Sequence, residues 1–201
     1  MREYFDVYVR RMHYSKIEFD EDAAQEVKDR LWQAEYAISK HNQYIKKYKS
    51  ATESNSQDIN NYISFNLIAN DELFNNGKFY AESYYYFSFR VYKILTHKNK
   101  PLPFLENFSC PGVLMTRNHL IEHPEGASSN ATKYSYSFSY EHGALLRTAD
   151  DSNQKFRDRG SVFNSTEFRE NFIKTVKKSY EEIYKLNPDP ILRPVPTPTS
   201  I

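Results

Sequence analysis

Residues 117–125 carry the most concentrated acid–base chemistry of the chain. They read Arg-Asn-His-Leu-Ile-Glu-His-Pro-Glu. They contain one permanent cation, Arg117, and two imidazoles, His119 and His123. A guanidinium holds a phosphate with a planar fork of donors, and an imidazole moves a proton near neutral pH. One imidazole could take the proton of a ribose 2′-hydroxyl, or donate one to the leaving oxygen, while Arg117 stabilises the charge on phosphorus. This chemistry predicts cleavage of RNA without a metal ion or any other cofactor.

The expected local structure of this segment is a short helix over about residues 113–122. Pro124 sets its end, because the residue before a proline is disfavoured in the helical region. At about 100° per residue, His119 and His123 lie nearly in register, whereas Arg117 points about 120° away from His123. Arg117 and His123 would therefore meet more readily across the two-fold axis of a dimer than on one helix.

The order Arg117-Asn118, four residues, His123 resembles the signature of the HEPN superfamily. The resemblance implies a bundle of four to five helices that forms a homodimer, with two copies of the motif facing each other across a cleft. It also implies metal-independent endoribonuclease activity, often in a toxin with its antitoxin or in defence against phage. Carried over by position, Arg117 and His123 would be catalytic and Asn118 would orient or polarise them. His119 and Glu122 stand outside that signature and are expected to be binding residues.

A zinc hydrolase is an alternative interpretation of the same segment. His119, Glu122 and His123 match the inverted zinc-protease pattern, in which two histidines bind Zn²⁺ and the glutamate acts as a base. Pro124 would end the helix where that pattern needs it to continue, and a third ligand would have to come from Glu181 or Glu182. We therefore expect no metal site here.

A purely structural role is the other alternative. Arg117 would then pair with Glu122 or another acid, and His123 would interact with the dipole at the end of its helix. The chain would in that case be a non-catalytic binding module that recognises a nucleotide or a protein partner.

Composition limits the classes of protein open to this chain. Its 201 residues suffice for one domain with a sizeable core, and 27 lysines and arginines nearly balance 26 acids. Attraction to RNA must therefore come from a local patch. Cys110 is the single cysteine, which excludes an internal disulfide framework. Charged residues follow Met1 where a signal peptide would be apolar, and no stretch approaches the roughly 20 apolar residues of a membrane span. We expect a cytoplasmic protein without a membrane partner.

Helical periodicity dominates the first half of the chain, so the expected fold is mainly α, an antiparallel helical bundle. Residues 1–19 carry both helix and strand spacing and are interpreted as a helix. Asp20 or Asp22 can cap a helix that runs to about residue 49. A third helix should begin after residues 54–56 and end at a turn formed by Asn76-Gly77, and a further helix should run from 78 to about 97.

A small β-hairpin and a C-terminal helix complete the expected single domain, residues 1–186. Alternating aromatic and serine residues predict a hairpin over about 133–148 with its turn at 141–143. Asn164 and Glu167 form a capping pair for a last helix over about 165–186. Five prolines make residues 187–201 an extended or disordered tail.

Several residues outside the motif could also serve a site. His41 is expected to be a satisfied core histidine on the apolar face of its helix. The hairpin aromatics could stack bases, although such a stripe is more often a buried face. Two lysine-rich stretches could contact phosphates if they flank the motif; they contain Lys46, Lys47 and Lys49 in one and Lys174, Lys177, Lys178 and Lys185 in the other.

Overall fold

The structure is a computed structural model that describes residues 1–54, 63–113, 133–139, 143–149 and 162–188. Its helices are α1 (Arg2–Tyr14), α2 (Glu21–Ser54), α3 (Ile63–Leu95) and α5 (Ser165–Leu186). Its strands are β1 (Lys133–Ser139), β2 (Gly143–Ala149) and β3 (Val162–Asn164), and residues 111–113 are helical as well. The chain is therefore mainly helical with a small antiparallel sheet, as the sequence predicts at this coarse level.

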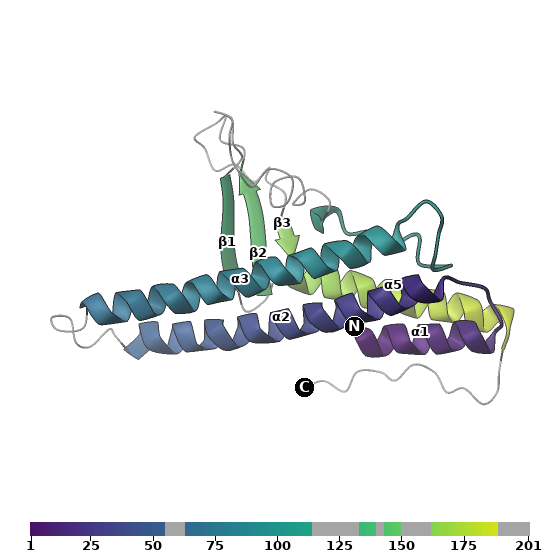
Figure 1. Cartoon of the computed structure of the whole chain (residues 1–201), viewed down its shortest axis with the longest axis horizontal. Helices are drawn as coiled ribbons and strands as arrows, with labels where there is room; N and C mark the ends of the chain where they lie inside the picture. Colours follow the sequence, from purple (N-terminus) through teal and green to yellow (C-terminus); the bar gives the residue numbers. More distant parts are fainter. Residues whose placement is uncertain (55–62, 114–132, 140–142, 150–161, 189–201) are drawn as a thin grey trace.

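The two longest helices, α2 and α3, pack against each other along much of their length and run antiparallel (Figure 1). Contacts along the pair show this direction: the beginning of α2 contacts the end of α3, and later residues of α2 contact earlier residues of α3. The Arg90 guanidinium lies 2.9 Å from the Glu26 carboxylate, and the rings of Tyr44 and Tyr80 stack with centroids 5.6 Å apart. Asp20 caps α2 as expected, because its Oδ1 accepts a hydrogen bond from the Ala23 amide at 2.9 Å.

The expected turn at Asn76-Gly77 is wrong, because α3 runs through these residues without a break. A Cβ on Gly77 would lie 2.9 Å from Ile45 Cδ1 and 3.2 Å from Tyr136 Oη. The glycine therefore allows α2 and β1 to approach α3 closely and does not end a helix. Consequently one helix of 33 residues replaces the two shorter ones that we expected from the sequence.

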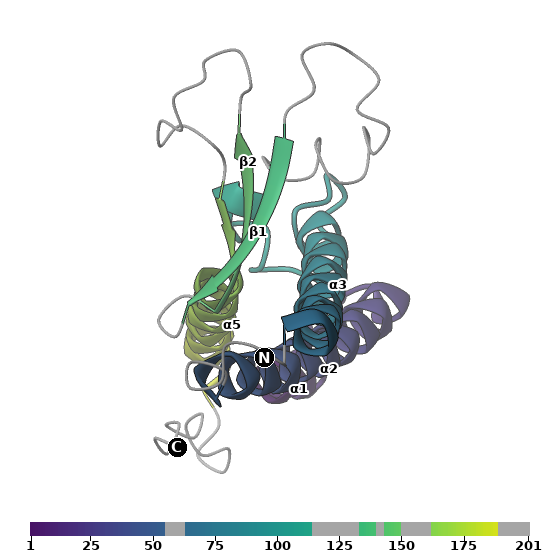
Figure 2. The same ribbon diagram turned by 90° about the vertical axis from the view of Figure 1, so that its left-hand side faces the viewer.

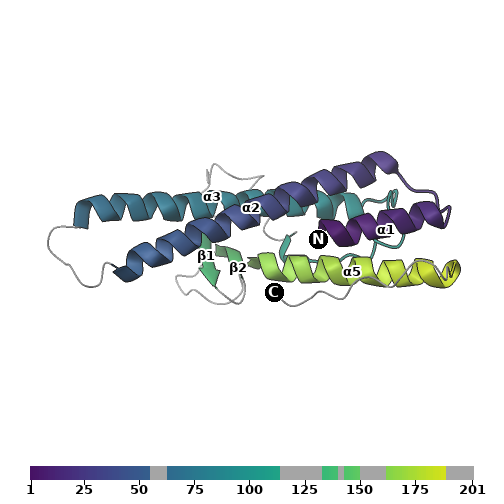
Figure 3. The same cartoon turned by 90° about the horizontal axis from the view of Figure 1, so that it is seen from below.

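The first and last helices of the chain, α1 and α5, lie side by side along one half of α2 (Figure 3). Ring contact between Phe5 and Phe172, at 6.3 Å between centroids, joins them, and the Lys28 ammonium pairs with Asp6 at 2.9 Å. Both helices are where the sequence predicts them. Asn164 caps α5, because its Oδ1 accepts the Thr166 and Glu167 amides at 2.9 and 3.1 Å.

The predicted hairpin is confirmed in its strands and extended by a third strand that we did not expect. In the antiparallel pair β1–β2, Lys133 lies opposite Ala149 and Ser139 opposite Gly143. β3 pairs with the other edge of β2 and leads directly into α5. Figure 2 shows β1 and β2 rising beyond the helices on the side of α3 and α5. The sheet thus ties the C-terminal helix to the long helical pair.

The core is rich in aromatic residues whose polar ends are satisfied. The hydroxyl of Tyr8 donates to the Pro103 carbonyl at 2.7 Å, and that of Tyr84 donates to the Ser165 carbonyl at 3.1 Å. Buried tyrosines of this kind join helices to loops while filling the interior. The largest fully buried aromatic side chains are Phe5, Tyr8, Tyr84, Tyr85, Phe163, Phe168 and Phe172.

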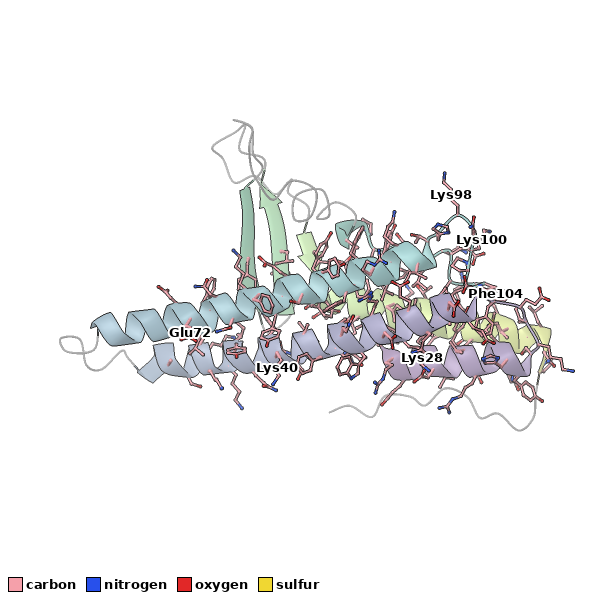
Figure 4. All side chains as sticks on the ribbon, in the orientation of Figure 1. Lys28, Lys40, Glu72, Lys98, Lys100 and Phe104 are labelled. Carbon is pink, nitrogen blue, oxygen red and sulfur yellow. The ribbon has the colours of Figure 1, made fainter. Side chains whose placement is uncertain are left out.

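Two aromatic side chains of α2 lie outside this core. Trp32 and Tyr36 are 54% and 48% exposed, and their rings stack at 6.0 Å between centroids. The ammonium of Lys40, labelled in Figure 4, lies 5.5 Å above the Tyr36 ring.

Among the helices that the structure describes, none is long and apolar enough to span a membrane.

Candidate functional site

The segment that carries the sequence motif lies outside the described residues, and so do Arg117, Asn118, His119, Glu122 and His123. The residues just before this segment are held against α3 by a hydrogen bond. The Tyr85 hydroxyl donates to the Val113 carbonyl at 2.9 Å, and the Val113 amide donates to the Cys110 carbonyl at 3.0 Å. Of the predicted helix over 113–122 only residue 113 is described, within the helical residues 111–113, and the tail beyond residue 188 lies outside the described residues.

The described part of the chain contains a different candidate site, a pocket of about 700 Å³. It lies between the second half of α2, the end of the hairpin and the beginning of α5. We call it the α2–α5 pocket. Its lining residues are Met1, Glu35, Ile38, His41, Asn42, Ile45, Lys46, Lys49, Ser50, Tyr84, Phe138, Gly143, Ser165, Thr166 and Arg169.

Helical spacing explains how α2 forms one wall of this pocket. Residues 35, 38, 42, 45, 46 and 49 recur at intervals of three and four, so they share one face of the helix. The opposite wall depends on a close contact between the hairpin and α5. Gly143 has φ +65, and a Cβ there would lie 2.4 Å from Ser165 Oγ. That hydroxyl oxygen accepts the Ala144 amide at 3.0 Å, which holds β2 against the first turn of α5.

The charged side chains of the pocket are mainly cationic. Its lining has three cations, Lys46, Lys49 and Arg169, and one carboxylate, Glu35. The Glu35 carboxylate is already paired with the Met1 amino group at 2.6 Å. Within the described residues, Lys46 and Arg169 form no ion pair with a carboxylate, and Lys49 lies 5.2 Å above the Phe138 ring. The pocket therefore offers positive charge to an anion.

Side chains, not free backbone amides, would make the contacts to such an anion. Asn164 already accepts the Thr166 and Glu167 amides at the start of α5. The dipole of this 22-residue helix still adds positive potential near its first turn. The hydroxyls of Ser165 and Thr166 stand at the same end of the helix and can donate hydrogen bonds.

His41 forms part of the wall and is held in one tautomer. Its Nδ1 lies 3.0 Å from Asn42 Oδ1, an oxygen that only accepts, so Nδ1 carries the hydrogen. Its Nε2 then accepts a hydrogen bond from the Tyr136 hydroxyl at 2.8 Å. Burial lowers the pKa of His41 more than the bond to Asn42 raises it, and burial raises the pKa of Tyr136. Both side chains are therefore neutral near pH 7, and the prediction of a satisfied core histidine is confirmed.

The hairpin aromatics that the structure describes pack against the helices. Tyr136 contacts Phe74 at 5.2 Å between ring centroids, and Phe138 contacts Tyr48 at 6.2 Å. This arrangement favours the buried-face interpretation for Tyr136 and Phe138. The side chains of Tyr134 and Tyr140 lie outside the described residues.

The lysine-rich stretches divide between two places. Lys46 and Lys49 line the α2–α5 pocket, whereas Lys47 lies over the Tyr44 ring at 5.8 Å and does not line the pocket. Lys174 and Lys178 border a smaller pocket of about 210 Å³ beside the loop after α3.

Cysteine and metal chemistry receive no support from the described side chains. Burial raises the pKa of the Cys110 thiol to about 11, so it stays protonated and weakly nucleophilic. The described residues contain no group of three metal-binding side chains. Glu182, a possible third zinc ligand, pairs with Lys178 at 3.8 Å.

Sequence reasoning missed Arg169, Ser165 and Thr166 as site residues. They follow a predicted helix start, and a cation five residues after Asn164 does not indicate a site unless one knows what packs beside it. Comparisons with protein-family models, with curated proteins and with solved structures found no match to this chain. Fold and site together define a mainly helical protein with a small sheet and a cationic pocket.

Proposed function

We propose that this chain is a metal-independent endoribonuclease in which Arg117 and His123 are catalytic and Asn118 orients them. The observation that carries the proposal is the order Arg117-Asn118, four residues, His123 in the sequence. The mainly helical fold is compatible with the bundle that such a motif implies. The cations of the α2–α5 pocket would support it further if they flank the motif, since they could then contact RNA phosphates.

The proposed reaction needs only these side chains and the ribose. The 2′-oxygen attacks the adjacent phosphorus and the bond from phosphorus to the 5′-oxygen breaks. The imidazole of His123 accepts the 2′-hydroxyl proton, and the imidazolium formed in this way donates a proton to the leaving 5′-oxygen. The guanidinium of Arg117 stabilises the negative charge that builds on the phosphoryl oxygens. The products are a 2′,3′-cyclic phosphate and a 5′-hydroxyl end.

A second candidate function is a non-catalytic binding module. The α2–α5 pocket favours it, because its cations can bind an anion while its histidine is buried, neutral and fully hydrogen-bonded. Either function is compatible with a toxin, which would have an antitoxin as its protein partner.

Cleavage of a labelled single-stranded RNA in EDTA separates these candidates. The wild type should cleave it and leave a cyclic phosphate, whereas Arg117→Ala and His123→Ala should each lose activity by about 100-fold or more. His97→Ala is the matched control, because His97 is an exposed histidine in the loop after α3 and should retain full activity.

Two results would remove the ribonuclease proposal. Equal cleavage by the wild type and His123→Ala would point to a contaminating nuclease. No cleavage with or without divalent ions would favour the binding module. Stoichiometric zinc in untagged protein, lost in His119→Ala, would support the zinc hydrolase instead.

A further inference from the structure

We propose that the α2–α5 pocket binds a phosphate monoester carried on a flat, apolar group. A nucleoside monophosphate and the 5′-phosphorylated end of a nucleic acid strand are two sources of this chemistry. The inference stands on the pocket alone and does not depend on cleavage by Arg117 and His123.

The charge of the pocket matches a dianion. Lys46 and Lys49 reach it from α2 and Arg169 from α5, while the nearby carboxylate of Glu35 is paired with the Met1 amino group at 2.6 Å. A phosphate monoester carries between one and two negative charges near pH 7, more than a diester or a carboxylate. Arg169 can add a bidentate contact to two phosphate oxygens.

Hydroxyl and amide donors complete the polar side of the pocket. Ser165 Oγ accepts the Ala144 amide, so its own hydrogen remains available to a ligand. Asn42 accepts from His41 through Oδ1, which leaves its amide nitrogen as a donor. Thr166 adds a second hydroxyl in the first turn of α5.

Four apolar or aromatic side chains also line the pocket and fit a flat body attached to the phosphate. Ile38 and Ile45 of α2, Tyr84 of α3 and Phe138 of β1 contribute to it. The pocket volume of about 700 Å³ falls within the range typical of small-molecule sites, about 300–1,000 Å³. Inorganic phosphate would fill only a small part of it, so we expect the apolar group to contribute to affinity.

Calorimetric titration of the full chain tests the pocket with adenosine monophosphate, uridine monophosphate, adenosine and inorganic phosphate. A monophosphate should bind at least 10-fold more tightly than adenosine or inorganic phosphate. The double variant Lys46→Ala/Arg169→Ala should weaken its binding by at least 10-fold. The control Lys93→Ala/Lys98→Ala removes two exposed cations elsewhere and the same net charge, and it should bind like the wild type.

Oligonucleotides with a 2′-O-methyl backbone, which cannot be cleaved through a 2′-hydroxyl, distinguish the two sources. Tighter binding of a 5′-phosphorylated strand than of the free monophosphate would assign the strand end as the ligand. Equal or weaker binding of the phosphorylated strand would assign the free nucleotide.

Three results would overturn the proposal. They are binding of adenosine as tight as that of adenosine monophosphate, equal losses in the two double variants, and no binding of either monophosphate at millimolar concentration. These titrations measure binding and do not require cleavage, so they can be carried out whether or not His123→Ala loses ribonuclease activity. The two proposals can therefore fail separately.

Discussion

His41 couples the stability of the fold to pH. Its imidazole is 1% exposed between Asn42 and Tyr136, and burial lowers its pKa. In the unfolded chain the ordinary pKa is about 6.5, so below that pH the unfolded state binds the proton more readily. The contribution of His41 to stability is therefore complete above pH 7 and is lost as the pH falls through about 6.5.

We predict that the free energy of unfolding falls more steeply between pH 7.5 and pH 5.5 in the wild type than in His41→Gln. Urea denaturation at the two pH values measures this difference. Parallel pH profiles for the wild type and His41→Gln would contradict the assignment.

Arg11 is a buried cation without a carboxylate partner among the described residues. It is 1% exposed, and its guanidinium lies 4.9 Å from the centre of the Tyr184 ring and 5.2 Å from that of Tyr14. Its Nη2 donates to the Asn187 carbonyl at the end of α5, while Nε and Nη1 have no hydrogen-bond partner. Packing on the rings and desolvation of the charge therefore oppose each other at this position.

Replacing Arg11 should separate the effect of packing from that of charge. Arg11→Met keeps most of the volume and removes the buried charge, so we expect a change in unfolding free energy within about 1 kcal/mol. Arg11→Ala leaves a cavity and should destabilise the fold by about 2–4 kcal/mol. Chemical denaturation of both variants measures this. Similar losses in both would show that the cation at the end of α5, and not its packing, stabilises the fold.

At the scale of the elements, local patterns predicted those parts of the fold that local interactions determine. The N-caps at Asp20 and Asn164 and the alternation in β1 are short-range signals, and each appears in the structure. β3 has three residues and no alternation long enough to detect. Gly77 was misread as a turn, because its role depends on Ile45 and Tyr136, which lie far away in the sequence.

Gly77 therefore offers a test of how closely α2 and α3 pack. Alanine has the better helix propensity by about 1 kcal/mol, but overpacking costs about 1–3 kcal/mol. We expect Gly77→Ala to destabilise the fold by about 1 kcal/mol net, measured by urea denaturation. In an Ile45→Val background, which lacks the Cδ1 atom that the new Cβ would meet, Gly77→Ala should be less harmful. An identical effect in both backgrounds would exclude this contact as the reason for the glycine.

At the scale of the whole molecule, the candidate pocket could not be read from the sequence. Lys46 and Arg169 come from helices at opposite ends of the chain, and the sheet brings those helices together. The motif at 117–123 was visible because its residue types are unusual in combination. The proposed composite site also requires a second copy of the chain, and residue spacing alone does not fix how two copies associate.

A composite site predicts that two inactive variants restore each other. If Arg117 of one copy acts with His123 of another, a mixed dimer of Arg117→Ala and His123→Ala retains one intact pair. Co-expression with two different tags, followed by purification of the mixed dimer, should recover about half of the wild-type activity, since one of two sites remains. A mixed dimer as inactive as either parent would place both groups in the same subunit.

The exposed pair of Trp32 and Tyr36 gives the molecule a built-in optical reporter. The chain has a single tryptophan, so all indole fluorescence originates from the outer side of α2. Association of two copies through that side would remove the indole from water and shift its emission to shorter wavelengths. Self-association through this surface can thus be followed by emission alone, at concentrations far below those that light scattering requires.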